Sequence, residues 1–103
     1  MAETRLPPIT PRTRVVASRK QLSTKLSGEA VILGLEDGIY YGLDGPGARI
    51  WELLQQPAML GDVAETICAE FAVGRDAATR DLLSLADDLL TRGLLELVPD
   101  PAS

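Results

Sequence analysis

The chain has 103 residues, of which 46% are hydrophobic and 24% are charged, and its net charge is −5. This length predicts one small domain with a surface groove, because it is too short to enclose a deep catalytic cavity between lobes. No apolar run approaches the about 18 residues that cross a bilayer. The N-terminus also lacks the apolar stretch of a secretory signal, which predicts a cytoplasmic protein without contact to a membrane.

Charge is unevenly distributed along the chain. Residues 1–25 hold six basic residues and one acidic residue, whereas residues 26–103 hold four basic and fourteen acidic residues. The basic N-terminal segment is expected to be a solvated edge, or to steer an acidic peptide or a partner enzyme. The acidic remainder disfavours binding to nucleic-acid phosphates.

Residues 1–12 contain three prolines and are predicted to form a flexible arm before a domain at 13–98. In that domain, residues 22–26 alternate between apolar and polar side chains, and residues 30–35 form an almost continuous apolar run. The Ser27-Gly28 pair between them supplies a turn, so the two segments are predicted to form a β-hairpin.

A third strand is predicted at residues 39–43, after a tight turn at Asp37-Gly38. The result is a three-stranded antiparallel meander, with residues 14–17 as a candidate strand pairing in front of it. Because neighbouring strand residues point to opposite faces, only one of Tyr40 and Tyr41 faces inward.

Three helices are predicted after the meander, where the apolar period changes to about 3.6 residues. The first runs to about residue 55 with Asp44 as N-cap and Pro46 in its first turn, and Trp51 on its core side. The second spans about 62–72, with Asp62 and Glu65 in capping-box spacing.

The third helix is predicted to be the longest. Asp76 caps its start, Gly93 follows its end, and leucines including Leu82, Leu89 and Leu90 form its core face. Residues 94–98 resemble a short closing strand, and residues 99–103 are expected to be a frayed tail.

The chain contains no histidine, which removes the commonest general base and a common metal ligand. Cys68 lacks basic neighbours and is interpreted as a core thiol, while Asp87 and Asp88 are interpreted as a solvated pair. We therefore expect a protein that is not an enzyme and uses no metal or cofactor. A sheet followed by three helices is also the order of a winged helix-turn-helix, so a DNA-binding regulator is the rival hypothesis.

Two segments together resemble the small PqqD-type proteins. They are VILGLEDGIYYGLD at residues 31–44 followed by GARIWELL at residues 47–54, and the likeness continues through DVAETI at 62–67 and DLLSLADDLLTRGLL at 81–95. The resemblance covers about residues 14–97 and implies an α+β, winged helix-turn-helix-like fold. It also implies a recognition element for ribosomally made, post-translationally modified peptides.

Members of this family bind the leader of a precursor peptide and present its core to modifying enzymes, and are not themselves enzymes. The Tyr-Tyr-Gly-Leu and Arg-Ile-Trp-Glu-Leu-Leu runs look most like the free-standing leader-binding proteins of lasso-peptide pathways. Their companions are a leader-cleaving cysteine protease and a macrolactam synthetase. The alternative within the family is delivery of a precursor peptide to a radical enzyme.

The resemblance also implies where the leader binds: as an added strand against the third β-strand, in the groove beside the third helix. Similar lasso systems recognise a Tyr-x-x-Pro element. An apolar pocket that would suit its aromatic ring is expected, lined by Val31, Leu33, Tyr41 and third-helix residues such as Leu82, Leu85 and Ala86. The peptide-binding residues expected on this basis are Val31, Leu33, Ile39, Tyr40, Tyr41, Gly42, Leu43, Asp81, Leu82, Leu85 and Ala86.

Overall fold

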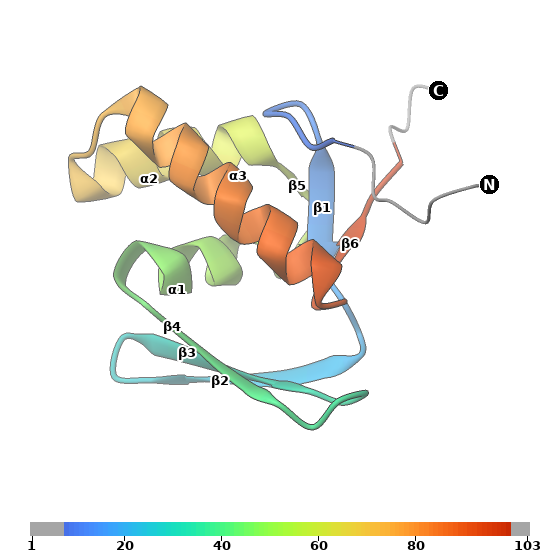
Figure 1. The fold of residues 1–103 in the computed structure, drawn as a ribbon. Helices are drawn as coiled ribbons and strands as arrows, with labels where there is room; N and C mark the ends of the chain where they lie inside the picture. Colours follow the sequence, from blue (N-terminus) through green and yellow to red (C-terminus); the bar gives the residue numbers. More distant parts are fainter. Residues whose placement is uncertain (1–7, 100–103) are drawn as a thin grey trace.

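The structure is a computed structural model that describes residues 8–99. Its elements are, in chain order, β1 (Arg14–Ala17), β2 (Gln21–Leu26), β3 (Glu29–Gly34), β4 (Tyr40–Asp44), α1 (Gly45–Leu53), β5 (Ala58–Met59), α2 (Leu60–Phe71), α3 (Arg75–Thr91) and β6 (Leu95–Leu97). The predicted α+β class, with a three-stranded antiparallel sheet and three helices, is confirmed (Figure 1). Residues 1–7 of the predicted arm and 100–103 of the predicted tail lie outside the described residues.

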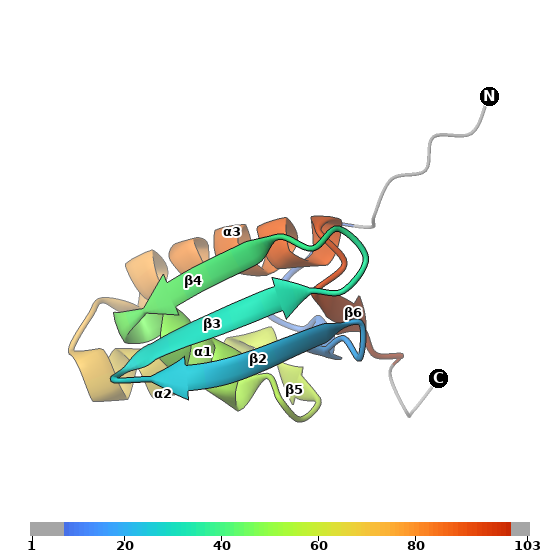
Figure 2. The same ribbon diagram turned by 90° about the horizontal axis from the view of Figure 1, so that it is seen from below.

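The predicted meander is the sheet β2-β3-β4, in which Ile32 pairs with Ser23 on one side and with Tyr41 on the other. Its first hairpin turns at Ser27 and Gly28, which both have positive φ, at 49° and 85°. Two successive positive φ values match the right-handed twist of the strands they connect. Seen from below, the sheet forms one layer, with the helices behind it (Figure 2).

Residues 14–17 form a strand, but the prediction that this strand pairs with the meander is wrong. β1 is the centre of a second sheet with the order β5-β1-β6, where Val15 pairs with both Ala58 and Leu97. Strand β5 was not predicted, because it consists of only two residues after Pro57 and is too short to show an alternation of apolar and polar residues. Each partner of β1 is distant in sequence, so no local pattern could indicate this pairing.

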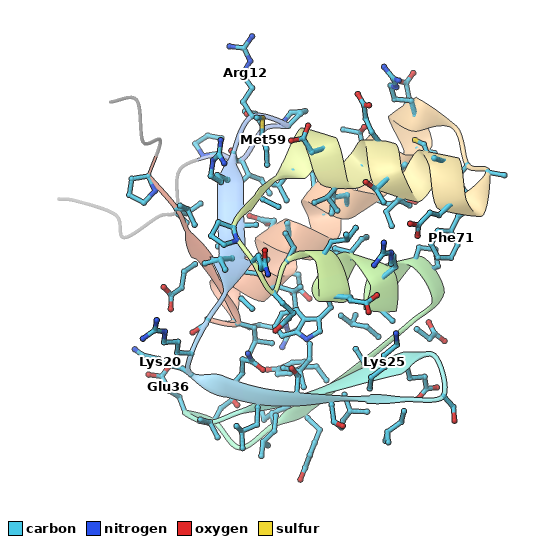
Figure 3. The ribbon with its side chains drawn as sticks, turned by 180° about the vertical axis from the view of Figure 1, so that it is seen from behind. Arg12, Lys20, Lys25, Glu36, Met59 and Phe71 are labelled. Carbon is cyan, nitrogen blue, oxygen red and sulfur yellow. The ribbon has the colours of Figure 1, made fainter. Side chains whose placement is uncertain are left out.

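The residues just before β1 are held against the start of α2. Thr13 accepts a hydrogen bond from the Leu60 amide at 2.9 Å, and Pro11 accepts one from the Gly61 amide at 2.7 Å. Arg12 and Met59 accordingly lie at the same end of β1 (Figure 3). The last residues of the predicted arm are therefore attached to the domain.

Two of the predicted helix caps are wrong. The N-caps of α2 and α3 are Met59 and Gly74, so Asp62 and Asp76 lie inside the first helical turns, where carboxylates still favour the helix dipole. Asp44 does occupy the N-cap of α1, but its side chain makes no capping hydrogen bond. Spacing alone located each helix start only to within a few residues.

The predicted end of α3 is confirmed. Gly93 adopts a φ of +77°, and the amide of Leu94 donates to the Leu89 carbonyl at 2.9 Å. The Gly93 amide donates to Leu90 at 3.0 Å, which completes a Schellman motif. This motif directs the chain from the helix straight into β6.

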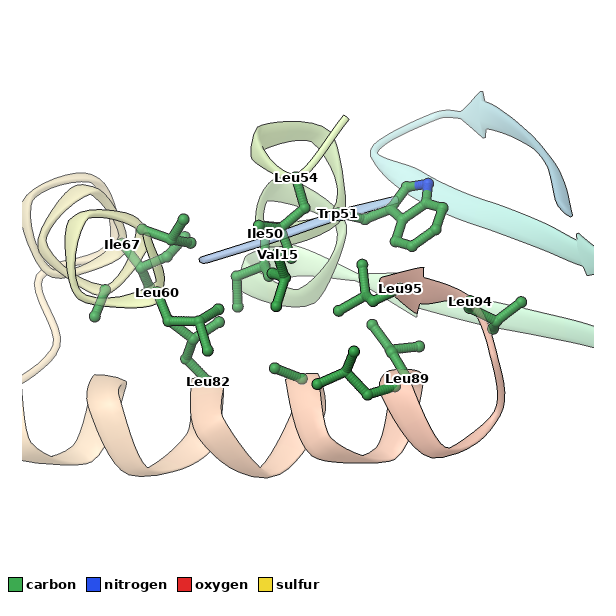
Figure 4. Packing of buried hydrophobic residues seen from close by; sticks show 14 of the residues in the cluster. Val15, Ile50, Trp51, Leu54, Leu60, Ile67, Leu82, Leu89, Leu94 and Leu95 are labelled. Carbon is green, nitrogen blue, oxygen red and sulfur yellow. The ribbon is translucent and has the colours of Figure 1, made fainter. Parts of the chain in front are cut away.

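One apolar core joins the two sheets and the three helices (Figure 4). As predicted, Trp51, Leu82, Leu89 and Leu90 belong to it, with Trp51 only 3% exposed. Cys68 is half-buried and packs against this core, in line with the predicted core thiol.

A chain of ion pairs connects β2, α1 and α2. Arg49 donates to both carboxylate oxygens of Glu70, at 2.8 and 3.0 Å, and to Glu52 at 2.9 Å, and Lys25 lies 3.2 Å from Glu52. These hydrogen bonds hold the pKa of Glu70 and of Glu52 below the ordinary value of 4.5 and raise the pKa of Arg49. Both carboxylates therefore favour the folded state in their ionised form.

Replacing Glu70 with Gln should remove an acid-sensitive part of the stability. Because the pKa of Glu70 is depressed on folding, its contribution is full above about pH 4.5 and is lost as the pH falls through the folded-state value. Urea unfolding should therefore show a larger wild-type advantage over Glu70→Gln at pH 7 than at pH 3. Glu65→Gln, whose carboxylate lies 4.0 Å from Arg75, is the control. Equal differences at the two pH values would contradict the argument.

Candidate peptide-binding groove

The free edge of β4 is the main feature of the candidate site. Within residues 8–99, β4 pairs only with β3. The Gly34 amide donates to the Ile39 carbonyl at 3.0 Å, and hydrogen bonding in an antiparallel ladder alternates from residue to residue. The backbone groups of Tyr41 and Leu43 therefore face β3, and those of Tyr40, Gly42 and Asp44 face the open side.

Helix α3 runs beside this open edge (Figure 2). Between them, at the first turn of α1, Gly47 lies under the side chains of Leu43 and Leu85. A Cβ atom on Gly47 would be 3.6 Å from Leu43 and 4.0 Å from Leu85. Since both leucines are half-buried and pack on the core, they present apolar surface between β4 and α3, where the predicted groove would lie. We call this apolar surface the floor of the candidate groove.

At the other end of β4 a polar cluster links the strand to the end of α3. Arg92 donates to the Tyr41 hydroxyl at 3.3 Å and to Asp88 at 3.1 Å, and its guanidinium lies 4.9 Å from the centre of the Tyr41 ring. The Tyr41 hydroxyl donates to Asp37 at 3.2 Å. The hydrogen bonds of Arg92 raise its pKa, and the bond to Tyr41 has the larger effect, followed by the bond to Asp88. The cluster therefore ties the start of β4 to the end of α3.

The exposed side of α3 next to the groove is acidic. A shallow hollow on it is lined by Asp81, Ser84, Leu85, Asp87, Asp88 and Thr91. Arg92 and Arg80 are the nearest balancing charges, and each lies beside an aspartate already, at 3.1 and 3.8 Å. This surface repels phosphates, so it opposes α3 acting as a DNA-recognition helix.

The predicted site residues fall into four groups. Tyr41 and Leu43 face the core side of the sheet and Leu85 lies across from them, whereas Val31, Leu33 and Tyr40 lie on the outer face. Leu82 and Ala86 are buried, at 1% and 0% exposure. The remaining members, Ile39, Gly42 and Asp81, are exposed.

The predicted pocket, in which Val31 and Leu33 join Tyr41 and α3, does not form. Val31 pairs with Gly42 and Leu33 pairs with Tyr40, so both lie on the opposite face of the sheet from Tyr41. The interpretation failed because a nearly continuous apolar strand does not show which alternate residues face inward. Leu82 and Ala86 could reach a peptide only if the core opened.

Sequence reasoning missed four residues of the groove. Asp37 was predicted only as part of a tight turn and Asp88 only as a solvated residue, and neither Gly47 nor Arg92 was assigned to the site. Arg92 and Tyr41 are 51 positions apart, so only the fold brings them together. The one available signal was an arginine in the last turn before Gly93, a place where its chain can reach a neighbouring strand.

Other kinds of site find little support in the described part of the chain. Residues 8–99 contain no group of three or more acidic or cysteine side chains that could hold a metal ion. In the same range no helix has the length and apolar character to span a membrane.

The chain matches a family model and is similar to solved structures. Residues 29–95 match the family model described as coenzyme PQQ synthesis protein D (PqqD). The solved structure of TbiB1 in complex with the TbiA(beta) leader peptide is 36% identical, with a TM-score of 0.75 over 82% of this chain and 99% of that one. No curated protein matches.

The second structural likeness concerns the fold alone. The tRNA-dependent lantibiotic dehydratase MibB from Microbispora sp. 107891 is 18% identical, with a TM-score of 0.54. The match covers 84% of this chain but 8% of the dehydratase. The fold therefore also occurs as a small part of a much longer chain.

Proposed function

The chain belongs to the PqqD family, and from this premise we propose that it binds the leader region of a ribosomally synthesised precursor peptide by β-strand addition to β4. The observation that carries the proposal is a free strand edge beside an apolar floor, in a chain 36% identical to a protein solved with a leader peptide. The acidic outer side of α3 favours a leader with basic residues near it.

In this binding mode, backbone hydrogen bonds supply the affinity and side-chain contacts supply the selectivity. The open backbone groups of Tyr40, Gly42 and Asp44 hydrogen-bond to the leader backbone whatever its side chains are. Alternate leader side chains then point into the groove, toward the floor at Leu43 and Leu85, and these contacts select the leader. The polar cluster at Tyr41 and Arg92 limits how far the leader extends along β4.

The role proposed for the bound state is presentation. Holding the leader raises the effective concentration of the precursor near the enzymes that act on it, without turnover by this chain. We propose a leader-cleaving cysteine protease and a macrolactam synthetase as those enzymes, from the resemblance to lasso-peptide proteins. Processing by a radical enzyme is the alternative within the family.

Fluorescence anisotropy of a labelled leader peptide from the adjacent precursor gene tests the binding proposal. Saturable binding of the leader without binding of the core peptide supports it, and binding of neither peptide contradicts it. Adding the protease and synthetase, or a radical enzyme, to the complex then shows which chemistry the bound leader stimulates. A labelled DNA duplex, with affinity that falls steeply as salt rises, would instead support the regulator.

The two adjacent tyrosines provide a matched test of the groove. Tyr41→Ala removes a ring that faces the core side of β4 and contacts Arg92, and it should weaken leader binding about tenfold, or about 1.4 kcal/mol. Tyr40→Ala changes a side chain that is 69% exposed on the other face and should change affinity much less. Anisotropy titrations measure both, and a larger effect for Tyr40→Ala would place the leader on the outer face.

A further inference from the structure

The sheet has a second free edge, on β2. Within residues 8–99, β2 pairs only with β3. The Leu35 amide donates to the Lys20 carbonyl at 3.0 Å, so the even residues of β2 bond to β3 and the odd ones face outward. The open backbone groups are therefore those of Gln21, Ser23 and Lys25. The side chains of these three residues lie on the face of the sheet that α1 covers.

A hollow of about 250 Å³ lies between this edge and α1. Its apolar lining includes Ala30, Ala48 and Trp51. The Lys25–Glu52 ion pair crosses from β2 to α1 at its rim, and Figure 3 shows Lys25 on that side of the sheet. A free lysine on an edge strand discourages pairing with another strand, but here the ion pair with Glu52 holds the Lys25 ammonium group against α1.

Two buried side-chain polar atoms near this edge, one on β2 and one on α1, have no hydrogen-bond partner. In residues 8–99, the buried side-chain polar atoms without a hydrogen-bond partner are Trp51 Nε1, a donor, and Gln21 Oε1, an acceptor. Trp51 lines the hollow, and its indole nitrogen points away from α3 (Figure 4). A buried polar atom left without a partner costs about 1–3 kcal/mol, so such atoms call for a structural explanation.

We propose that β2 pairs with β2 of a second copy of this chain, antiparallel about a two-fold axis at Ser23. In this register Ser23 pairs with Ser23, and Gln21 pairs with Lys25 of the other copy, as hydrogen-bonded pairs built from the open backbone groups. No like charges lie opposite each other. Gln21 then lies opposite Lys25 of the other copy, a residue that lines that copy's hollow. Turning the Gln21 side chain out of its own copy would bring its unpaired acceptor toward the unpaired Trp51 donor of the other copy.

The outer face of the sheet supports the same arrangement. Leu22 and Leu26 are 62% and 56% exposed on β2, and pairing two copies brings these residues of both chains onto one continuous face. The resulting sheet has six strands and leaves the β4 edge of each copy open at its two ends. This inference does not depend on leader binding.

A contact made by one strand is smaller than the roughly 1,200–2,000 Å² of a stable interface, so the dimer should depend on concentration. Sedimentation velocity from micromolar to millimolar protein should show a monomer–dimer equilibrium for the wild type. Ser23→Pro removes the outward amide at the axis without touching the β2–β3 ladder, and it should weaken the dimer at least tenfold. Ser23→Ala keeps that amide and should dimerise as the wild type does.

Two further measurements report on the register and the side chains. In a Cys68→Ala background, Ser23→Cys should form a disulfide dimer under mild oxidation, whereas Lys25→Cys, which faces Gln21, should not. Trp51 is the one tryptophan of the chain, so its emission should shift with concentration in the wild type and less in Gln21→Leu.

A wild type that stays monomeric at millimolar concentration overturns the proposal, as does a dimer that Ser23→Pro leaves intact. Circular dichroism checks that Ser23→Pro folds, and the cysteine variants test the same register independently of it. Leader binding by monomeric Ser23→Pro should equal that of the wild type, because β4 lies two strands away. A leader-binding failure therefore leaves the dimer test unaffected.

Discussion

Gly42→Pro should abolish most leader binding while leaving the fold in place. The Gly42 amide faces the open side of β4, so proline there removes a hydrogen bond that an added strand needs and puts a ring where that strand must approach. Losing the bond and the close approach together should weaken binding at least about 100-fold, or about 2.8 kcal/mol. Anisotropy of a labelled leader measures the loss.

Gly42→Ala is the matched control for that prediction. A Cβ on Gly42 would meet no atom within 4 Å, and the φ angle of Gly42 is not positive. Alanine therefore fits at this position and keeps the backbone amide. Its affinity should stay within a few-fold of the wild type. If alanine and proline weaken binding equally, the β4 backbone is not what holds the leader. Urea unfolding of both variants shows whether the sheet itself has been disturbed.

Local patterns in the sequence were enough for the meander and the helices. A Ser-Gly turn between an alternating strand and an apolar one, the change from alternation to a 3.6-residue period, and a glycine after α3 each describe nearby residues. Each of these predictions is confirmed. The second sheet was not predictable in this way. It joins β1 to β5 and β6, and its central Val15 is fully buried by partners from the middle and end of the chain.

The site was predictable as an edge but not as a set of side chains. The family resemblance indicated the strand now seen at β4, and the free edge there follows from its place in the sheet. Which residues line the groove depends on strand facing and on the position of α3. Val31 and Leu33 turn away from it, while Arg92 reaches Tyr41 from 51 positions along the chain.

The two open edges of one sheet invite opposite uses. At β4 the neighbouring helix supplies an apolar floor and an acidic side, features that can select one peptide among many. At β2 the outward residues are polar, and an antiparallel pair of these strands places no like charges opposite each other. One unpaired donor and one unpaired acceptor also lie near this edge. Selective capture therefore fits β4, and self-association fits β2.

Leu85→Asp should weaken leader binding about as strongly as Gly42→Pro, through the floor of the groove. Leu85 is half-buried near Leu43 and Gly47, so an aspartate there places a charge where an apolar leader side chain is expected to pack. We expect at least about a 100-fold loss in anisotropy titrations, or about 2.8 kcal/mol. Thermal unfolding should show a smaller loss of stability than that of binding, because part of the leucine is already exposed.

Ser84→Asp is the control that shows whether the effect of Leu85→Asp comes from the position of the carboxylate or from its charge alone. It adds the same carboxylate to the neighbouring residue of α3, on the acidic side of the helix, so the affinity should stay unchanged or rise for a leader with basic residues there. Leu85→Met, which keeps the apolar volume, should bind nearly as the wild type does. Equal losses for Leu85→Asp and Ser84→Asp would mean that long-range repulsion from α3 governs binding. Selection by the floor predicts instead a loss confined to Leu85→Asp, with affinity retained in the methionine variant.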